Sequence, residues 1–334
     1  MRTTDETTGG HSDATTTGRP LWGRAARAGV PTIPLPRDSA PAGAQPTARG
    51  ITTTVPSQAS TGVAELLRGP VRSARVLLSV PAAVYLSVPG AQGNEVVGVL
   101  TADAARLPLG CVLFRPSNGR SLVSVPSGAP ARVGAGRIVV GDLTVSAAAW
   151  WDPRPKLPTA RPALLPEGVR QLRAAVYGEG VPHSAFSLPG LPTGPSGPLA
   201  ALRGSVRRAD LDAALRTATR LVGLGPGLTP AGDDVLAGLT AGLVLLGHPA
   251  ADRFGAGVTS LAAGRTTELS RALLQHAAGR VSGEFAAVLR GLVGDGALAP
   301  AITALLRTGS TSGRAMALGL CTAIDLVDRT TRPR

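Results

Sequence analysis

The chain has 334 residues, 43% of them hydrophobic, which is enough for a sizeable core and favours two domains. Only 3% are aromatic, and the net charge of +13 comes almost entirely from arginine, since Lys156 is the only lysine. Because the arginines are scattered and few rings are available to stack on bases, the composition argues against a nucleic-acid-binding protein. Cys111 and Cys321 are too few for a disulfide framework or a metal-ligand cluster.

The first segment, residues 1–62, is rich in Thr, Ser, Pro, Gly and Ala and shows little periodicity, so we expect an unstructured tail. Its start, MRTTDETTGG, lacks the apolar stretch of a signal peptide. The longest apolar run, residues 235–247, is too short to span a bilayer. These features predict a cytoplasmic protein without a membrane partner.

Residues 63–155 carry short runs rich in Val and Leu, with turn-forming residues between them. The runs are ARVLLSV, AVYLSV, EVVGVLTA, CVLFRP, SLVSVP and GRIVVGDLTVSAAAWW, and turns such as PGAQGN and PSGAP separate them. Strands that recur about every ten residues are typical of a small barrel or sandwich. We therefore expect a β-rich N-terminal domain.

The remaining segment, residues 156–334, begins with a proline-rich linker and then changes to a helical period. Apolar residues recur on one face over residues 210–222, and a second apolar helix is expected to run to about Leu246. Further helical patterns cover residues 256–277, 283–293, 299–307 and 313–327. The fold class predicted for the whole chain is therefore α+β, with a barrel or sandwich-like domain followed by a mostly α-helical one.

One stretch of the helical half, GLGPGLTPAGDD at residues 223–234, permits two interpretations. In the first, Thr229 caps a helix and Pro230 occupies its first position. The positive end of the helix dipole then stabilises the two aspartates in the first turn. In the second, the loop amides bind an anion, since Gly225, Gly227 and Gly232 need a reason that capping does not supply. Asp233 and Asp234 could then hold Mg²⁺ or accept hydrogen bonds from a substrate amide.

Two more helix openings have a similar character. RTTELS brings Thr266 and Ser270 onto one helix face, and TGSTSGR offers Ser312 as a cap and Arg314 as a partner for an anion. Each could equally be a polar surface turn. Three such openings in one helical domain suggest that they converge on one pocket.

GLGPGLTPAGDD, RTTELS and GSTSG, in this order and in a helical C-terminal half, resemble a bacterial family that includes the AllH-type subunit of oxamate carbamoyltransferase, an enzyme of allantoin breakdown. The family motif reads GLGPGLTPSGDD, so this chain has Ala231 in place of a serine. The resemblance extends over roughly residues 70–330.

The resemblance implies carbamoyl transfer between carbamoyl phosphate and oxamate, with oxalurate and phosphate as products, by an enzyme that contains other subunits. Asp233 and Asp234 are then the candidate catalytic residues and the candidate Mg²⁺ ligands. The candidate residues for binding a small anionic substrate are Gly225, Gly227, Leu228, Thr229, Gly232, Thr266, Ser270, Ser312, Gly313 and Arg314.

Two other functions remain open from the residues alone. In a non-catalytic assembly subunit, the glycines would serve helix packing only. In a regulator that binds a metabolite or nucleotide, the basic charge would attract the ligand.

Overall fold

The computed structural model describes residues 53–91, 93–159, 162–178, 188–192, 194 and 196–331, all within one compact unit, Arg49–Arg334. Residues 1–52 of the expected tail lie outside the described residues. The tail boundary at residue 62 is wrong, because residues 53–60 form a strand. That strand reads TTVPSQAS, and its threonines and serines obscure the strand pattern in the sequence.

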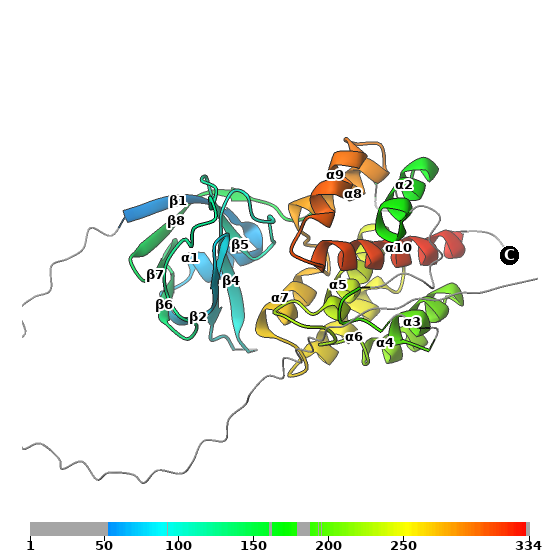
Figure 1. Cartoon of the computed structure of the whole chain (residues 1–334), viewed down its shortest axis with the longest axis horizontal. Coiled ribbons are helices and arrows are strands. Elements are labelled where there is room, and N and C mark those ends of the chain that lie inside the picture. The colour runs from blue at the N-terminus through cyan, green and yellow to red at the C-terminus, as the bar shows by residue number, and fades with distance from the viewer. Residues whose placement is uncertain are drawn as a thin grey trace, which may run out of the picture. The chain divides into compact units, whose positions relative to one another are not determined.

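The strands form a closed eight-stranded barrel in the order β1-β5-β4-β3-β2-β6-β7-β8, and Figure 1 shows them gathered together with the short helix α1. The ladders β1–β8 and β4–β5 are parallel, and the others are antiparallel. The α+β prediction is thus confirmed. The elements of this part are β1 (Thr53–Ser60), η1 (Thr61–Val63), α1 (Ala64–Arg68), β2 (Arg72–Val80), β3 (Ala83–Val88), β4 (Glu95–Leu100), β5 (Gly110–Leu113), β6 (Pro130–Gly134), β7 (Arg137–Val140) and β8 (Leu143–Trp151).

Two details of the expected strands differ from the barrel. The run SLVSVP, residues 121–126, is not a strand: Val123 is buried against the barrel, but its carbonyl accepts a hydrogen bond from the Ser79 hydroxyl (3.0 Å). The neighbouring strand is instead β6, which begins at Pro130 and pairs with β2 and β7. The long run that ends at Trp151 divides into β7 and β8 at a two-residue turn that begins with Gly141.

The second part is helical, and within the described residues no helix is long and apolar enough to cross a membrane. The pattern expected over residues 256–277 is two helices, because a turn at residues 263–267 interrupts it. Two helices that begin at prolines were not predicted at all. The helices are α2 (Pro166–Tyr177), α3 (Pro198–Arg207), α4 (Leu211–Ala218), α5 (Ala231–Leu245), α6 (Ala251–Ala262), α7 (Glu268–His276), α8 (Gly283–Leu292), α9 (Leu298–Leu306) and α10 (Ser312–Thr331).

Helix α5 is the centre of the helical part, with every residue from Ala231 to Leu243 buried. It packs on α10 through glycines at which the two backbones nearly touch. A Cβ added to Gly238 would lie 2.1 Å from the carbonyl oxygen of Met316, and one added to Gly319 would lie 2.2 Å from that of Val235. The Thr229 and Ser312 hydroxyls lie 2.9 Å apart at one end of the pair, and a Cβ added to Gly242 would lie 2.5 Å from that of Ala323 at the other end. The helices therefore run in the same direction, and their N-termini lie side by side.

The barrel and the helices meet along α7. Its residues Leu269 and Ala272 belong to the hydrophobic cluster of the barrel, and Glu268 forms an ion pair with Arg75 on β2. Three residues further along the same face of α7, Arg271 donates to the carbonyl of Asn94, just before β4. Helix α7 is therefore held by both parts of the molecule. Its first turn can position the residues that it contacts in the helical part.

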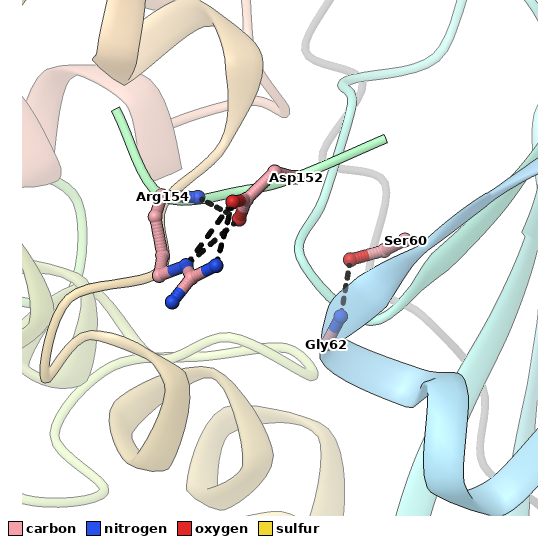
Figure 2. Close-up of polar contacts among 4 residues, drawn as sticks. All are labelled: Ser60, Gly62, Asp152 and Arg154. Atoms are coloured by element: carbon pink, nitrogen blue, oxygen red, sulfur yellow. Dashed lines mark hydrogen bonds and ion pairs between the residues drawn. The ribbon is translucent and has the colours of Figure 1, made fainter. Parts of the chain in front are cut away.

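A second junction lies where the parallel strands β1 and β8 end side by side, at Ser60 and Trp151. Figure 2 shows the Ser60 hydroxyl accepting from the amide of Gly62 (3.0 Å) and the Asp152 carboxylate bound to Arg154, just after β8. The amide of Val281 donates to the carbonyl of Pro153 (3.0 Å), and thus ties this exit to the start of α8.

Candidate functional site

Asp233, in the first turn of α5, is almost completely buried and accepts three hydrogen bonds. Its Oδ1 accepts from the backbone amide of Gly223 (2.9 Å). Its Oδ2 accepts from the hydroxyls of Thr266 and Ser270 (2.8 Å for Ser270). One carboxylate therefore joins the Gly-rich loop to the opening of α7, as the shared character of these segments suggested.

Asp234, the next residue, is equally buried, with 4% of its surface exposed, but it is bonded quite differently. Its Oδ2 receives no hydrogen bond from the described residues. Burial, together with the nearby Asp233 carboxylate, raises the pKa of Asp234 to about 7, although the hydroxyls of Ser312 and Thr229 act in the opposite direction. A buried carboxyl group that lacks a partner and titrates near neutrality is typical of a functional site.

The hydroxyls beside Asp234 come from two helix openings. Thr229 Oγ1 and Ser312 Oγ are 2.9 Å apart and hydrogen-bonded, so the start of α10 meets the start of α5. Because one hydroxyl donates to the other, only one of the pair is left to donate to Asp234. The N-termini of α5, α7 and α10 thus converge on the two aspartates, and the partial positive charges of helix N-termini favour negative groups there.

The loop before α5 offers free donors. The amides of Gly225, Gly227, Leu228 and Thr229 donate to no carbonyl or side chain of the described part of the chain. The carbonyl of Leu228 accepts from the Thr267 hydroxyl, and the Leu228 side chain packs against the barrel cluster. The loop is therefore held at the junction of barrel and helices while its amides stay available to a ligand.

Not every glycine of the motif needs a ligand. A Cβ on Gly232 would lie 2.1 Å from the carbonyl oxygen of Leu221, and one on Gly313 would lie 1.8 Å from that of Leu305, so both are explained by close packing. Gly225 and Gly227 have φ angles of +121° and +89°, which side-chain-bearing residues rarely adopt. Gly227 also has open space around it, so only its backbone conformation requires glycine.

One sequence-based expectation about this loop is wrong. Pro230, and not Thr229, is the N-cap of α5, and no side chain caps the helix; the Thr229 hydroxyl binds Ser312 instead. Arg314, at the start of α10, is exposed, and no hydrogen bond or ion pair of the described residues links it to the aspartates, so its contact with an anion stays a prediction. Arg314 lies two residues after Ser312, so its side chain is rotated by roughly 200° around the axis of α10. It faces away from α5 because Ser312 faces toward α5.

The arrangement does not fit a Mg²⁺ site built from both carboxylates. Three of the roughly four lone-pair positions of the Asp233 carboxylate accept hydrogen bonds from N–H and O–H donors, which leaves it little capacity to bind a metal ion. Within the part of the chain that the structure describes, no three His, Cys, Asp or Glu side chains form a cluster suited to a metal. Asp234 Oδ2 is fully buried and has no hydrogen-bond partner among the described residues.

The sequence reasoning overlooked two contributors to this site. The amide of Gly223 and the hydroxyl of Thr267 were not among the candidates, yet both bind the converging segments. Thr267 is the N-cap of α7 and accepts from the amide of Ser270 (3.0 Å). The spacing T-x-x-S, in which a threonine precedes a short amphipathic helix, was the signal that could have identified it.

Residues 221–324 match the model of the family described as oxamate carbamoyltransferase subunit AllH. The match covers less than a third of the chain and lies wholly in the helical part, from just before the Gly-rich loop to within α10. The resemblance seen in the three motifs is thereby confirmed over this segment. Comparisons with curated proteins and with solved structures return no match.

Proposed function

We propose, on the premise that this chain belongs to the AllH family over residues 221–324, that it is a subunit of an oxamate carbamoyltransferase-like enzyme. It would act in the cytoplasm, together with other subunits, in the breakdown of allantoin. The reaction would interconvert carbamoyl phosphate plus oxamate with oxalurate plus phosphate. The substrate of this chain would be one of these small anions.

The observation that carries the proposal is the convergence of three helix N-termini on two buried aspartates. The free amides of Gly225, Gly227, Leu228 and Thr229 lie in the loop before one of these helices and would bind the oxygens of an anion. Thr229 and Ser312 would complete the site with their hydroxyls, next to Asp234. Thr266 and Ser270 would act indirectly, because their hydroxyls bind Asp233.

The chemistry needs positioning more than a strong catalyst. In the forward direction, the nitrogen of oxamate would form a bond to the carbamoyl carbon. The bond from that carbon to the bridging oxygen would break, phosphate would leave with the electron pair, and the nitrogen would lose a proton to it. Amides at a helix N-terminus stabilise the charge on the departing phosphate, and holding both reactants in one geometry lowers the entropic barrier.

Thermal unfolding of the full chain with phosphate, carbamoyl phosphate or oxamate tests the proposal. A ligand at a hundred times its Kd stabilises the folded protein by about 2.7 kcal/mol, which is easily measured. Thr229→Val should abolish the shift, because it removes a hydroxyl from the site. The matched control is Thr303→Val on the exposed face of α9, which should keep the full shift.

A second candidate, a non-catalytic assembly subunit, is favoured by one observation: Gly232 and Gly313 are explained by packing alone. This alternative predicts that none of the three anions shifts the unfolding temperature. It also predicts that Gly232→Ala lowers stability and prevents binding to the other subunits. A ligand-dependent shift that Thr229→Val removes would exclude it.

A further inference from the structure

The Asp234 carboxyl group is the one buried polar group of this site that is left incomplete. Its Oδ2 lies in a nearly dry environment, at the N-termini of two parallel helices, and accepts nothing. An unpaired buried acceptor costs about 1–3 kcal/mol, so its position needs an explanation. Asp233, one residue earlier, shows that this fold can supply N–H and O–H donors to a buried carboxylate where structure alone requires them.

The groups around Asp234 restrict what could complete it. The hydroxyls of Thr229 and Ser312 are bonded to each other, so they have one hydrogen to share with the aspartate. The free amides of the Gly-rich loop do not donate to Asp234 Oδ2, and they suit the oxygens of an anion. The missing partner of Oδ2 is therefore an N–H or O–H donor carried by the ligand itself.

We propose that Asp234 accepts a hydrogen bond from a primary amide, –C(=O)NH₂, of a small anion whose negative oxygens bind the amides of Gly225, Gly227, Leu228 and Thr229. The inference rests on the proposed function and makes Asp234 the residue that selects the substrate. Carbamoyl phosphate and oxamate both combine a primary amide with an anionic group. Thr229, whose hydroxyl lies beside Asp234, belongs to a loop in which Gly223, Gly225 and Gly227 have positive φ angles.

Two pairs of ligands isolate this hydrogen bond, because within each pair a methyl group replaces the –NH₂ group. Acetyl phosphate is the counterpart of carbamoyl phosphate, and pyruvate is the counterpart of oxamate. We expect the full-length protein, titrated calorimetrically, to bind the amide of at least one pair at least about tenfold more tightly than the methyl analogue, as expected for one hydrogen bond to a charged group. The pair that shows the preference identifies which substrate Asp234 contacts.

Two variants assign the preference to this residue. Asp234→Asn and the apolar isostere Asp234→Leu should reduce the ratio to about one to three while phosphate still binds, since a neutral or apolar side chain no longer offers a carboxylate acceptor. Asp252→Asn is the matched control: it removes an exposed carboxylate from the first turn of α6 and should leave the ratio unchanged.

The outcomes separate this inference from the proposed function. Equal affinity for both members of both pairs, or a preference that survives in both Asp234 variants, overturns the inference and leaves the anion site intact. If the wild-type protein binds neither phosphate nor any of the four ligands, the proposed function fails, and the inference fails with it.

Discussion

Adjacent aspartates with opposite surroundings are the most informative residues of this molecule. Asp233 accepts three hydrogen bonds from segments that are distant in sequence, so it holds the loop, α5 and α7 together. Asp234 has a free oxygen and a pKa raised to about 7. A double negative charge at a helix start is thus explained as one structural and one available carboxyl group.

Asp234 should make the stability of the protein depend on pH. The pKa is about 7 in the folded protein and near 3.8 when unfolded, so the folded state binds the proton more tightly. Stability is therefore highest below pH 4 for this group and is lost as pH rises from about 4 to 7, by up to about 4 kcal/mol. Urea unfolding across this range should show Asp234→Asn gaining on the wild-type protein as pH rises. A difference that does not change with pH would contradict the assignment.

Replacing Asp233 by asparagine should lower the stability of the protein at neutral pH, in contrast to the same change at Asp234. In Asp233→Asn, the side-chain amide would place an N–H group against the amide of Gly223 or against the two hydroxyls, which leaves a buried donor unpaired. We expect a loss of about 1–3 kcal/mol in the free energy of unfolding at neutral pH. Chemical denaturation measures it, with the exposed Asp252→Asn as the control that should change stability by less than about 0.5 kcal/mol. Equal effects of the two substitutions would refute a structural role for Asp233.

Among the secondary structure elements, the parallel pair α5 and α10 has the greatest influence on the site. Two helix N-termini side by side repel through their dipoles, and the pair Asp233 and Asp234 in the first turn of α5 offsets this repulsion. The close approach that makes Thr229 reach Ser312 depends on Gly238 and Gly319, where the backbones are nearly in contact. The geometry of the site therefore depends on how closely these two helices pack.

Adding one methyl group to this helix pair should be costly. A Cβ on Gly238 would meet the Met316 carbonyl at 2.1 Å, so Gly238→Ala should force α10 outward and lose at least about 1–3 kcal/mol. The control is Gly204→Ala in α3, where the nearest neighbour is the flexible end of Arg208 at 3.4 Å; it should stabilise by about 0.5–1 kcal/mol. Thermal unfolding of both variants provides the comparison, and a neutral Gly238→Ala would show that the helices lie further apart.

The whole molecule has two hydrophobic cores that α7 couples. One core fills the barrel and the other surrounds α5, but Leu269 and Ala272 of α7 lie in the barrel cluster, while Leu274 belongs to the helical one. The Leu228 side chain, next to the free loop amides, also packs on the barrel. The barrel thus supports the loop from outside the segment that matches the AllH family.

Loosening this coupling should change how the protein unfolds. Leu269 is almost completely buried, and Leu269→Ala should cost about 2–5 kcal/mol. Because the lost contacts join the two cores, we expect differential scanning calorimetry to resolve one transition into two. Leu305→Ala, inside the helical core alone, is the control that should lower the melting temperature while retaining a single transition. One transition in both variants would show that α7 does not couple the cores.

Much of this architecture is determined by the sequence alone, because it depends on local pattern. The change from short Val- and Leu-rich runs to a helical period predicts a β-rich part followed by helices, and a Gly-rich motif with its two aspartates carries the resemblance to the AllH family that residues 221–324 show. Local sequence patterns fail to predict elements whose conformation is set by contacts with distant segments. It misses β1, whose threonines and serines are polar but pair with β5 and β8, and it misses the break that separates α6 from α7.

Only the tertiary structure decides what the candidate residues do. Two neighbouring aspartates are indistinguishable in sequence, and their difference arises because Gly223, Thr266 and Ser270 all reach Asp233 while none reaches Asp234. Likewise, Gly232 and Gly313 are required by backbones that come from other elements, and Arg314 is directed to solvent by the rotation of α10. Hydrogen bonds and burial depend on which distant segments are brought together, and no local pattern of residues contains that information.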